Sequence, residues 1–129
     1  MGKYDLYPSR LEFVSKIKIL EGDITDEYLG LGHEQFTRLT NWASVIFHVA
    51  AKVNSIDTYQ QHYRHNVVGT KNVLRVATLG SRKSFHYFSS LDIWGPRGYL
   101  FGTRHVSEDA PLLPHLKARL YDIGYTQSQ

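Results

Sequence analysis

The sequence has no cysteine, which excludes disulfide bonds and thiolate metal sites and is consistent with a cytoplasmic protein. It also has no apolar run of about 18 residues, and its first residues lack the charged and then apolar pattern of a secretory signal. Neither a membrane span nor secretion is therefore indicated. A chain of 129 residues is the size of one domain and is long enough to bury a core.

The charge balance is basic, with a net charge of +3 and a pI of about 9.2, so nucleic acids and phosphates have to be considered as partners. Four basic residues recur at spacings of 7, 4 and 7, which places them on one helix face: Arg64, Lys71, Arg75 and Arg82. No aromatic residues for base stacking are interleaved with them, which favours a solvated face over a nucleic-acid site. His62 and His65 could share a metal, but no third ligand is evident, and we expect no metal site.

Three short segments predict β-strands: residues 16–20, 45–47 and 85–88. Residues 45–47 are wholly apolar, which is typical of a strand buried on both faces of a sheet. Helical spacing of apolar residues predicts a short helix over 33–42 and a longer one that carries Tyr59, Tyr63, Val67, Thr70, Leu74 and Ala77 on one face. We expect Gly69, inside the longer helix, to allow close packing against the sheet. The alternation of strands and helices predicts an α/β fold with a parallel sheet.

Small or polar residues follow each predicted strand. Asp23 lies in an acidic turn after the first strand, where its carboxylate could bind a ribose or an adenine amino group; an Asx turn or helix cap is the favoured alternative. Ala50-Ala51 follows the second strand and Ser89-Ser90 the third. Because the carboxyl ends of parallel strands share one edge of a sheet, we expect a ligand to bind there. His48, beside the second strand, is interpreted as a hydrogen-bonded structural histidine.

Five segments carry a family resemblance, in the right order and at plausible spacings: Gly-Asp-Ile (22–24), His-Val-Ala-Ala (48–51), Asn-Val-Val-Gly-Thr (66–70), Tyr-Phe-Ser-Ser (87–90) and Tyr125. Together they resemble the extended short-chain dehydrogenases. The resemblance is closest to the NAD(P)H-dependent thioester (carboxylic acid) reductase domains of multidomain peptide and polyketide synthases of the fungal type. Such a domain would reduce an acyl thioester bound to an acyl carrier protein, giving an aldehyde or an alcohol.

The resemblance also implies roles for single residues. Ser90 would hydrogen-bond the substrate carbonyl and Tyr125 would be the general acid, while Gln129 stands where the family has the lysine of Tyr-x-x-x-Lys. Two hydroxyl donors agree with the chemistry, because hydride addition builds negative charge on the carbonyl oxygen. The implied contacts with NADPH or NADH are Asp23 and Ile24 beside the adenine, Ala50, Ala51 and Lys52 along the ribose and nicotinamide, and Asn66 as a support of the strand ends.

The sequence departs from the family pattern in two places. The family begins with a strand and a glycine-rich turn that binds the pyrophosphate, and nothing before Lys16 supplies them. We therefore expect a partial Rossmann-like sheet within one truncated reductase-like domain over residues 1–129, with residues 1–15 poorly structured and 92–120 an irregular loop region. Gln129 supplies no positive charge for a tyrosine phenolate. The 129 residues alone are accordingly expected to be inactive, and a non-catalytic Rossmann-like interaction module is the alternative reading.

Overall fold

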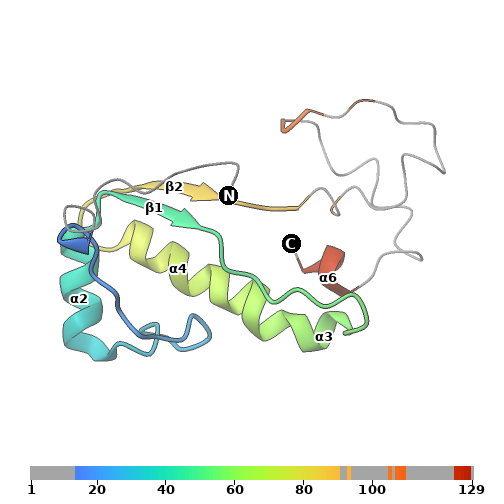
Figure 1. The fold of residues 1–129 in the computed structure, drawn as a ribbon, viewed down its shortest axis with the longest axis horizontal. Helices are drawn as coiled ribbons and strands as arrows, with labels where there is room; N and C mark the ends of the chain where they lie inside the picture. Colours follow the sequence, from blue (N-terminus) through green and yellow to red (C-terminus); the bar gives the residue numbers. More distant parts are fainter. Residues whose placement is uncertain (1–13, 91–92, 94–104, 106, 110–123, 129) are drawn as a thin grey trace, which may run out of the picture.

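A computed structural model of the chain describes residues 14–90, 93, 105, 107–109 and 124–128, which form a small parallel sheet lying on helices (Figure 1). Strand β1 (Val45–His48) pairs in parallel with β2 (Ser84–Tyr87), with Val45 opposite Ser84 and His48 opposite Tyr87. The helical segment between the two strands lies along one face of this sheet (Figure 1). The α/β fold with parallel strands is thereby confirmed.

The short predicted helix is α2 (Gly32–Trp42), whose Phe36 and Thr40 are buried. Phe36 meets the ring of Tyr28 edge-on at a centroid distance of 5.5 Å. On the exposed side, Arg38 and Glu34 form an i,i+4 ion pair of 2.7 Å. The helix thus closes one end of the core, which is formed mainly by Phe36, Ala43, Val73, Val76 and Ala77.

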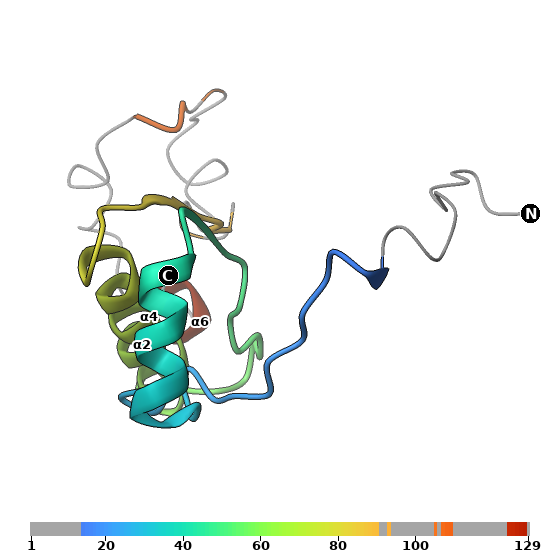
Figure 2. The same cartoon turned by 90° about the vertical axis from the view of Figure 1, so that its left-hand side faces the viewer.

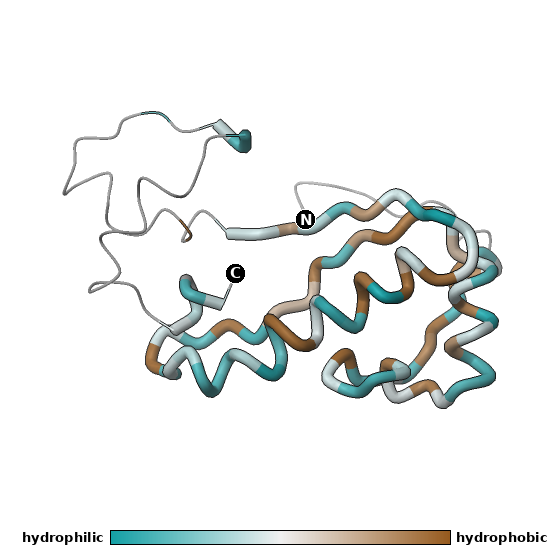
Figure 3. Tube along the Cα trace, turned by 180° about the vertical axis from the view of Figure 1, so that it is seen from behind, coloured by the Kyte–Doolittle hydropathy of each residue, from teal (hydrophilic) through white to brown (hydrophobic). Residues whose placement is uncertain are grey.

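The longer predicted helix is one continuous run of α3 (Tyr59–His62), η1 (Tyr63–Val68) and α4 (Gly69–Thr78). A capping box starts it, because the backbone N–H of Thr58 donates to Gln61 Oε1 at 2.8 Å. The middle segment, η1, is a π-helix, a form that is rare and frequently marks functional sites. Figure 3 shows polar and apolar residues alternating along α4.

The inward face of this run differs from the predicted one. Leu74 and Tyr63 are 39% and 38% exposed, whereas the buried positions include His62 and Asn66. Hydrophobic periodicity missed this face because its first half is polar and its contacts are hydrogen bonds. Gly69 is buried, and a Cβ at this position would lie only 2.8 Å from Cδ1 of Ile24. The expected close packing therefore exists, although it is against Ile24 rather than against the sheet.

Two strand predictions need correction. Residues 17–20 are extended but belong to no strand, and they run outward from the rest of the molecule (Figure 2). Ile19 is 88% exposed, and within the described residues no strand lies beside this segment to complete its hydrogen bonds. The strand β1 is buried on one face only, since Phe47 is 64% exposed while His48 is buried. Helices cover a single face of the sheet in the described part of the chain.

Parts of the sequence predictions fall outside the described residues. These include residues 1–13, most of the irregular region at 92–120, and Gln129. In the part of the chain that the structure does describe, no helix is both long and apolar enough to cross a membrane.

Candidate active site

The carboxyl ends of β1 and β2 point to the same end of the molecule, where α3 and the short helix α6 (Gly124–Gln127) lie together (Figure 1). The chain leaves β1 through Ala50 and Ala51, whose side chains are exposed, and it leaves β2 toward Ser90, which is half-buried. Tyr125 on α6 is 8% exposed. The predicted ledge, the predicted serine and the predicted tyrosine therefore all lie at this end.

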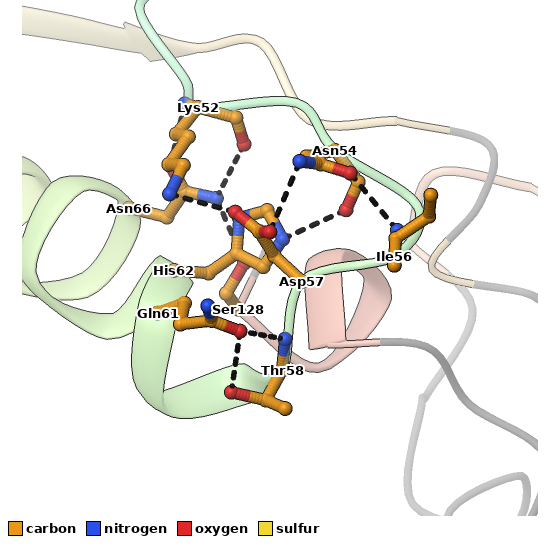
Figure 4. Close-up of polar contacts among 9 residues, drawn as sticks. All are labelled: Lys52, Asn54, Ile56, Asp57, Thr58, Gln61, His62, Asn66 and Ser128. Carbon is orange, nitrogen blue, oxygen red and sulfur yellow. Dashed lines mark hydrogen bonds and ion pairs between the residues drawn. The ribbon is translucent and has the colours of Figure 1, made fainter.

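Asn66 in η1 connects the end of β1 to the C-terminal helix (Figure 4). Its Oδ1 accepts the backbone N–H of Lys52 at 2.7 Å, and its Nδ2 donates to the carbonyl of Lys52 at 3.0 Å. The same Nδ2 donates to Ser128 Oγ at 2.8 Å, and Ser128 Oγ donates to the carbonyl of Tyr125 at 2.7 Å. Asn66 is 3% exposed, so the amide is fully committed to this clamp. These bonds hold the backbone just beyond β1, while a role of Asn66 in the cofactor site stays a prediction.

The helix α6 also contacts the start of α3. A Cβ on Gly124 would run into the backbone of Asp57, Thr58 and Tyr59, so only glycine allows this approach. The ring of Tyr125 lies 5.9 Å from that of His62, which is completely buried. Tyr125 is therefore held by backbone contact at Gly124, by the ring of His62 and, through Ser128, by Asn66.

The loop after β1 is held by polar contacts of its own (Figure 4). Lys52 Nζ bonds Asp57 Oδ2 at 2.7 Å, and Asn54 Nδ2 donates to Asp57 Oδ1 at 3.0 Å. Asn54 Oδ1 accepts the backbone N–H of Ile56 at 2.9 Å. The ammonium group of Lys52, which was predicted to contact the cofactor, is therefore paired with Asp57.

A second, partly buried network joins His48 at the end of β1 to the helical run. His48 Nε2 is 2.9 Å from Thr70 Oγ1, and the Thr70 hydroxyl donates to the carbonyl of Asn66 at 2.6 Å. Since the hydroxyl has one hydrogen, His48 must donate from Nε2, which is the structural role predicted for it. Burial lowers the pKa of His48 below 6.5. Burial and, to a smaller extent, the Tyr125 phenol raise the pKa of Tyr87, while a hydrogen bond with Thr70 acts in the opposite direction.

Asp23 and Ile24 lie in the turn that follows the extended segment. Thr25 N–H donates to Asp23 Oδ1 at 2.8 Å, which is the Asx turn that was the favoured alternative. Hydrogen bonds from Thr25 lower the pKa of Asp23, whose side chain is exposed. Asn72 Nδ2 donates to the carbonyls of Ile24 and Asp26 at 2.9 and 3.0 Å, so α4 holds the turn in place. A role beside an adenine stays a prediction.

The basic residues are solvated, as predicted, but Arg82 lies beyond the end of α4 at Thr78 and does not belong to the helix face. Arg75 pairs with Glu27 at 3.1 Å and Arg64 with Asp26 at 3.8 Å, with most of these side chains exposed. His62, which was considered as a metal ligand, instead directs Nε2 to the carbonyl of Asn54 at 2.9 Å.

Sequence reasoning missed Ser128, Thr70, Gly124 and the buried contact of His62. A usable signal existed, because His62, Asn66 and Thr70 recur at steps of four and form a polar stripe on a helix. Ser128 had no such signal, since its partner Asn66 is 62 residues away in the chain.

Comparison with known proteins identifies the relatives of this arrangement. The profile of an NAD-binding family, described as Male sterility protein, matches residues 1–128. The chain belongs to this family. It is 45% identical over 129 residues to the non-canonical nonribosomal peptide synthetase FrzA of a Cladobotryum species and 47% identical over 129 residues to the aldehyde reductase lnaA of Aspergillus flavus. The match covers 100% of this chain and 12% of each relative.

A solved structure agrees with the sequence relatives. The terminal R domain from the myxalamid PKS-NRPS biosynthetic pathway superposes with a TM-score of 0.77 at 31% identity, covering 97% of this chain and 30% of that domain. The resemblance to reductase domains of synthases and the Rossmann-like fold are confirmed. The chain spans less than a third of the R domain, and the roles of its single residues stay predictions.

The described residues fit one side of a nicotinamide dinucleotide, the cofactor class of this family. Ala50 and Ala51 are exposed at the carboxyl end of β1 and carry no atom beyond Cβ, so a flat ring or a ribose can approach the backbone there. The Asp23 carboxylate is exposed, and within the turn it accepts hydrogen bonds from Thr25. A glycine-rich pyrophosphate turn is not part of the sequence before Lys16.

Proposed function

We propose that this chain forms part of a reductase that transfers hydride from NADPH or NADH to a carrier-bound acyl thioester. The observation that carries the proposal is the Asn66 clamp, which joins the backbone at the end of β1 to the helix of Tyr125 through Ser128. It couples the exposed ledge at Ala50 and Ala51 to the proposed general acid. The relatives, which include a synthetase, an aldehyde reductase and an R domain, support the same chemistry.

In this proposal the bound cofactor supplies the hydride. Hydride addition to the thioester carbonyl carbon leaves negative charge on the carbonyl oxygen, and the hydroxyls of Ser90 and Tyr125 stabilise that charge by hydrogen bonds. Tyr125 then gives its proton to the oxygen as the general acid. Loss of the carrier thiol yields an aldehyde, and a second reduction yields an alcohol. Asp23, Ile24, Ala50, Ala51 and Lys52 are proposed to line the cofactor.

Gln129 is proposed to occupy the position of the family lysine. A glutamine amide can hydrogen-bond the cofactor ribose, but it brings no cation to the phenolate that remains after proton donation. Gln129→Lys should therefore raise kcat in the intact protein, since a nearby positive charge favours the charged form of the tyrosine.

The test uses the intact protein, an acyl thioester on its carrier domain, and NADPH oxidation followed by absorbance. Tyr125→Phe and Ser90→Ala should each lower kcat roughly 10²- to 10³-fold, as loss of one oxyanion donor does in other enzymes. Tyr63→Phe is the matched control, because Tyr63 lies on the exposed side of η1. Wild-type turnover by Tyr125→Phe would refute the proposal.

A non-catalytic interaction module is the second candidate, and Gln129 is the residue that favours it. The two are separated by NADPH itself. A reductase gains thermal stability with increasing NADPH, whereas an interaction module without a dinucleotide site does not.

A further inference from the structure

His62 is a buried histidine in which only one of the two ring nitrogens has a hydrogen-bond partner among the described residues. Its exposure is 0%, and Nε2 lies 2.9 Å from the carbonyl oxygen of Asn54. A carbonyl only accepts, so Nε2 carries the hydrogen and donates it. Nδ1 has no hydrogen-bond partner in the part of the chain that the structure describes. Among the described residues, the His62 ring is therefore anchored by a hydrogen bond at Nε2 alone.

The placement of His62 explains why an imidazole is useful at this position. Its N–H fixes the loop that follows β1, at Asn54, while its ring lies against Tyr125 with the two ring planes at 59°. Gly124 brings α6 into backbone contact with the start of α3, so the ring of Tyr125 has little freedom to move away. An aliphatic side chain would fill the space without binding Asn54.

We propose that His62 is a positioning residue that sets the ring of Tyr125 relative to the end of β1. The inference rests on the proposed function, in which Tyr125 is the general acid. His62 positions Tyr125 through the ring contact, whereas its hydrogen bond to Asn54 stabilises the folded loop after β1. It is a positioning residue because it is proposed to act through Tyr125. A small displacement of a catalytic group lowers turnover strongly, since misplacement by about 1 Å can cost roughly 100-fold.

Two variants in the intact protein separate the contacts. His62→Gln keeps an N–H for the Asn54 carbonyl but removes the ring beside Tyr125. We expect kcat to fall about tenfold or more, with KM for NADPH within about twofold of wild type, because cofactor binding is not touched. His62→Phe keeps a flat ring and loses the N–H. We expect it to unfold at a lower temperature while its folded fraction retains kcat within about threefold of wild type.

The controls are His65→Gln, three residues along and exposed, which should keep wild-type kcat, and Tyr125→Phe. A His62→Gln enzyme with wild-type kcat would overturn the positioning role, and so would a His62→Phe enzyme that is as slow as His62→Gln. If one variant does not fold, the kcat of the other, compared with that of the wild type, decides. When Tyr125→Phe is slow but His62→Gln is not, the proposed function stands and only this inference fails; full turnover by Tyr125→Phe refutes both.

Discussion

Replacing Asn66 by alanine should loosen the end of β1 and the helix of Tyr125 together. The substitution removes three hydrogen bonds at once, two to the backbone of Lys52 and one to Ser128. Asn72 offers a matched control on the same helical run, because its Nδ2 also makes two partly buried hydrogen bonds to backbone carbonyls, those of Ile24 and Asp26.

The size of the effect follows from the exposure of the partners. Lys52 is half-buried, so water can replace part of what its N–H and carbonyl lose, and each bond contributes about 0.5–1.5 kcal/mol. Ser128 is 5% exposed, and in the variant its hydroxyl no longer accepts a hydrogen bond from residue 66. The hydroxyl still donates to the carbonyl of Tyr125, so it keeps one hydrogen-bond partner. The free energy of unfolding should therefore fall by about 2–4 kcal/mol, of which roughly 1.4 kcal/mol acts at the Lys52 amide.

Hydrogen exchange followed by mass spectrometry measures this locally in the intact protein. A loss of about 1.4 kcal/mol at the Lys52 N–H makes its exchange about tenfold faster, and peptides that cover residues 49–54 and 124–128 should show it. Asn72→Ala should instead accelerate exchange in the turn at residues 22–29. Unchanged exchange at Lys52 in Asn66→Ala, or equal acceleration there in Asn72→Ala, would refute the clamp.

Two further predictions concern packing and pH. Gly69→Ala gains about 1 kcal/mol of helix propensity but places a Cβ 2.8 Å from Cδ1 and 2.9 Å from Cγ1 of Ile24, so we expect a net loss of stability. Ile24→Ala removes both atoms and should partly restore stability in a double-mutant cycle of unfolding free energies. Additive effects of the two substitutions would contradict this contact. Because burial lowers the folded-state pKa of His48 below 6.5, its contribution to stability is present above about pH 6.5 and is lost as the pH falls below that value. Thermal unfolding from pH 8 to pH 5 should show a smaller decrease in His48→Gln than in the wild type, and equal slopes would argue against a buried neutral His48.

The candidate site could be predicted in part because strand ends and motifs are local. Ala50, Ala51 and Ser90 follow apolar segments directly, so a parallel sheet must bring them to the same edge. The turn at Asp23 was equally local, since an Asx turn joins residues two apart. The His62 and Ser128 contacts with the Tyr125 helix were not predicted, because they join segments far apart in the chain.

Local pattern by itself determined the parallel βαβ order, the two helical stretches and the family resemblance, because periodicity and short motifs are properties of neighbouring residues. Tertiary structure alone decided which face of each element is buried and which strand is paired. Residues 16–20 alternate as a strand does, yet a strand exists only where a neighbour completes its hydrogen bonds. The same holds for Tyr125, whose place beside His62 depends on a glycine packed against backbone about 66 residues away in the chain.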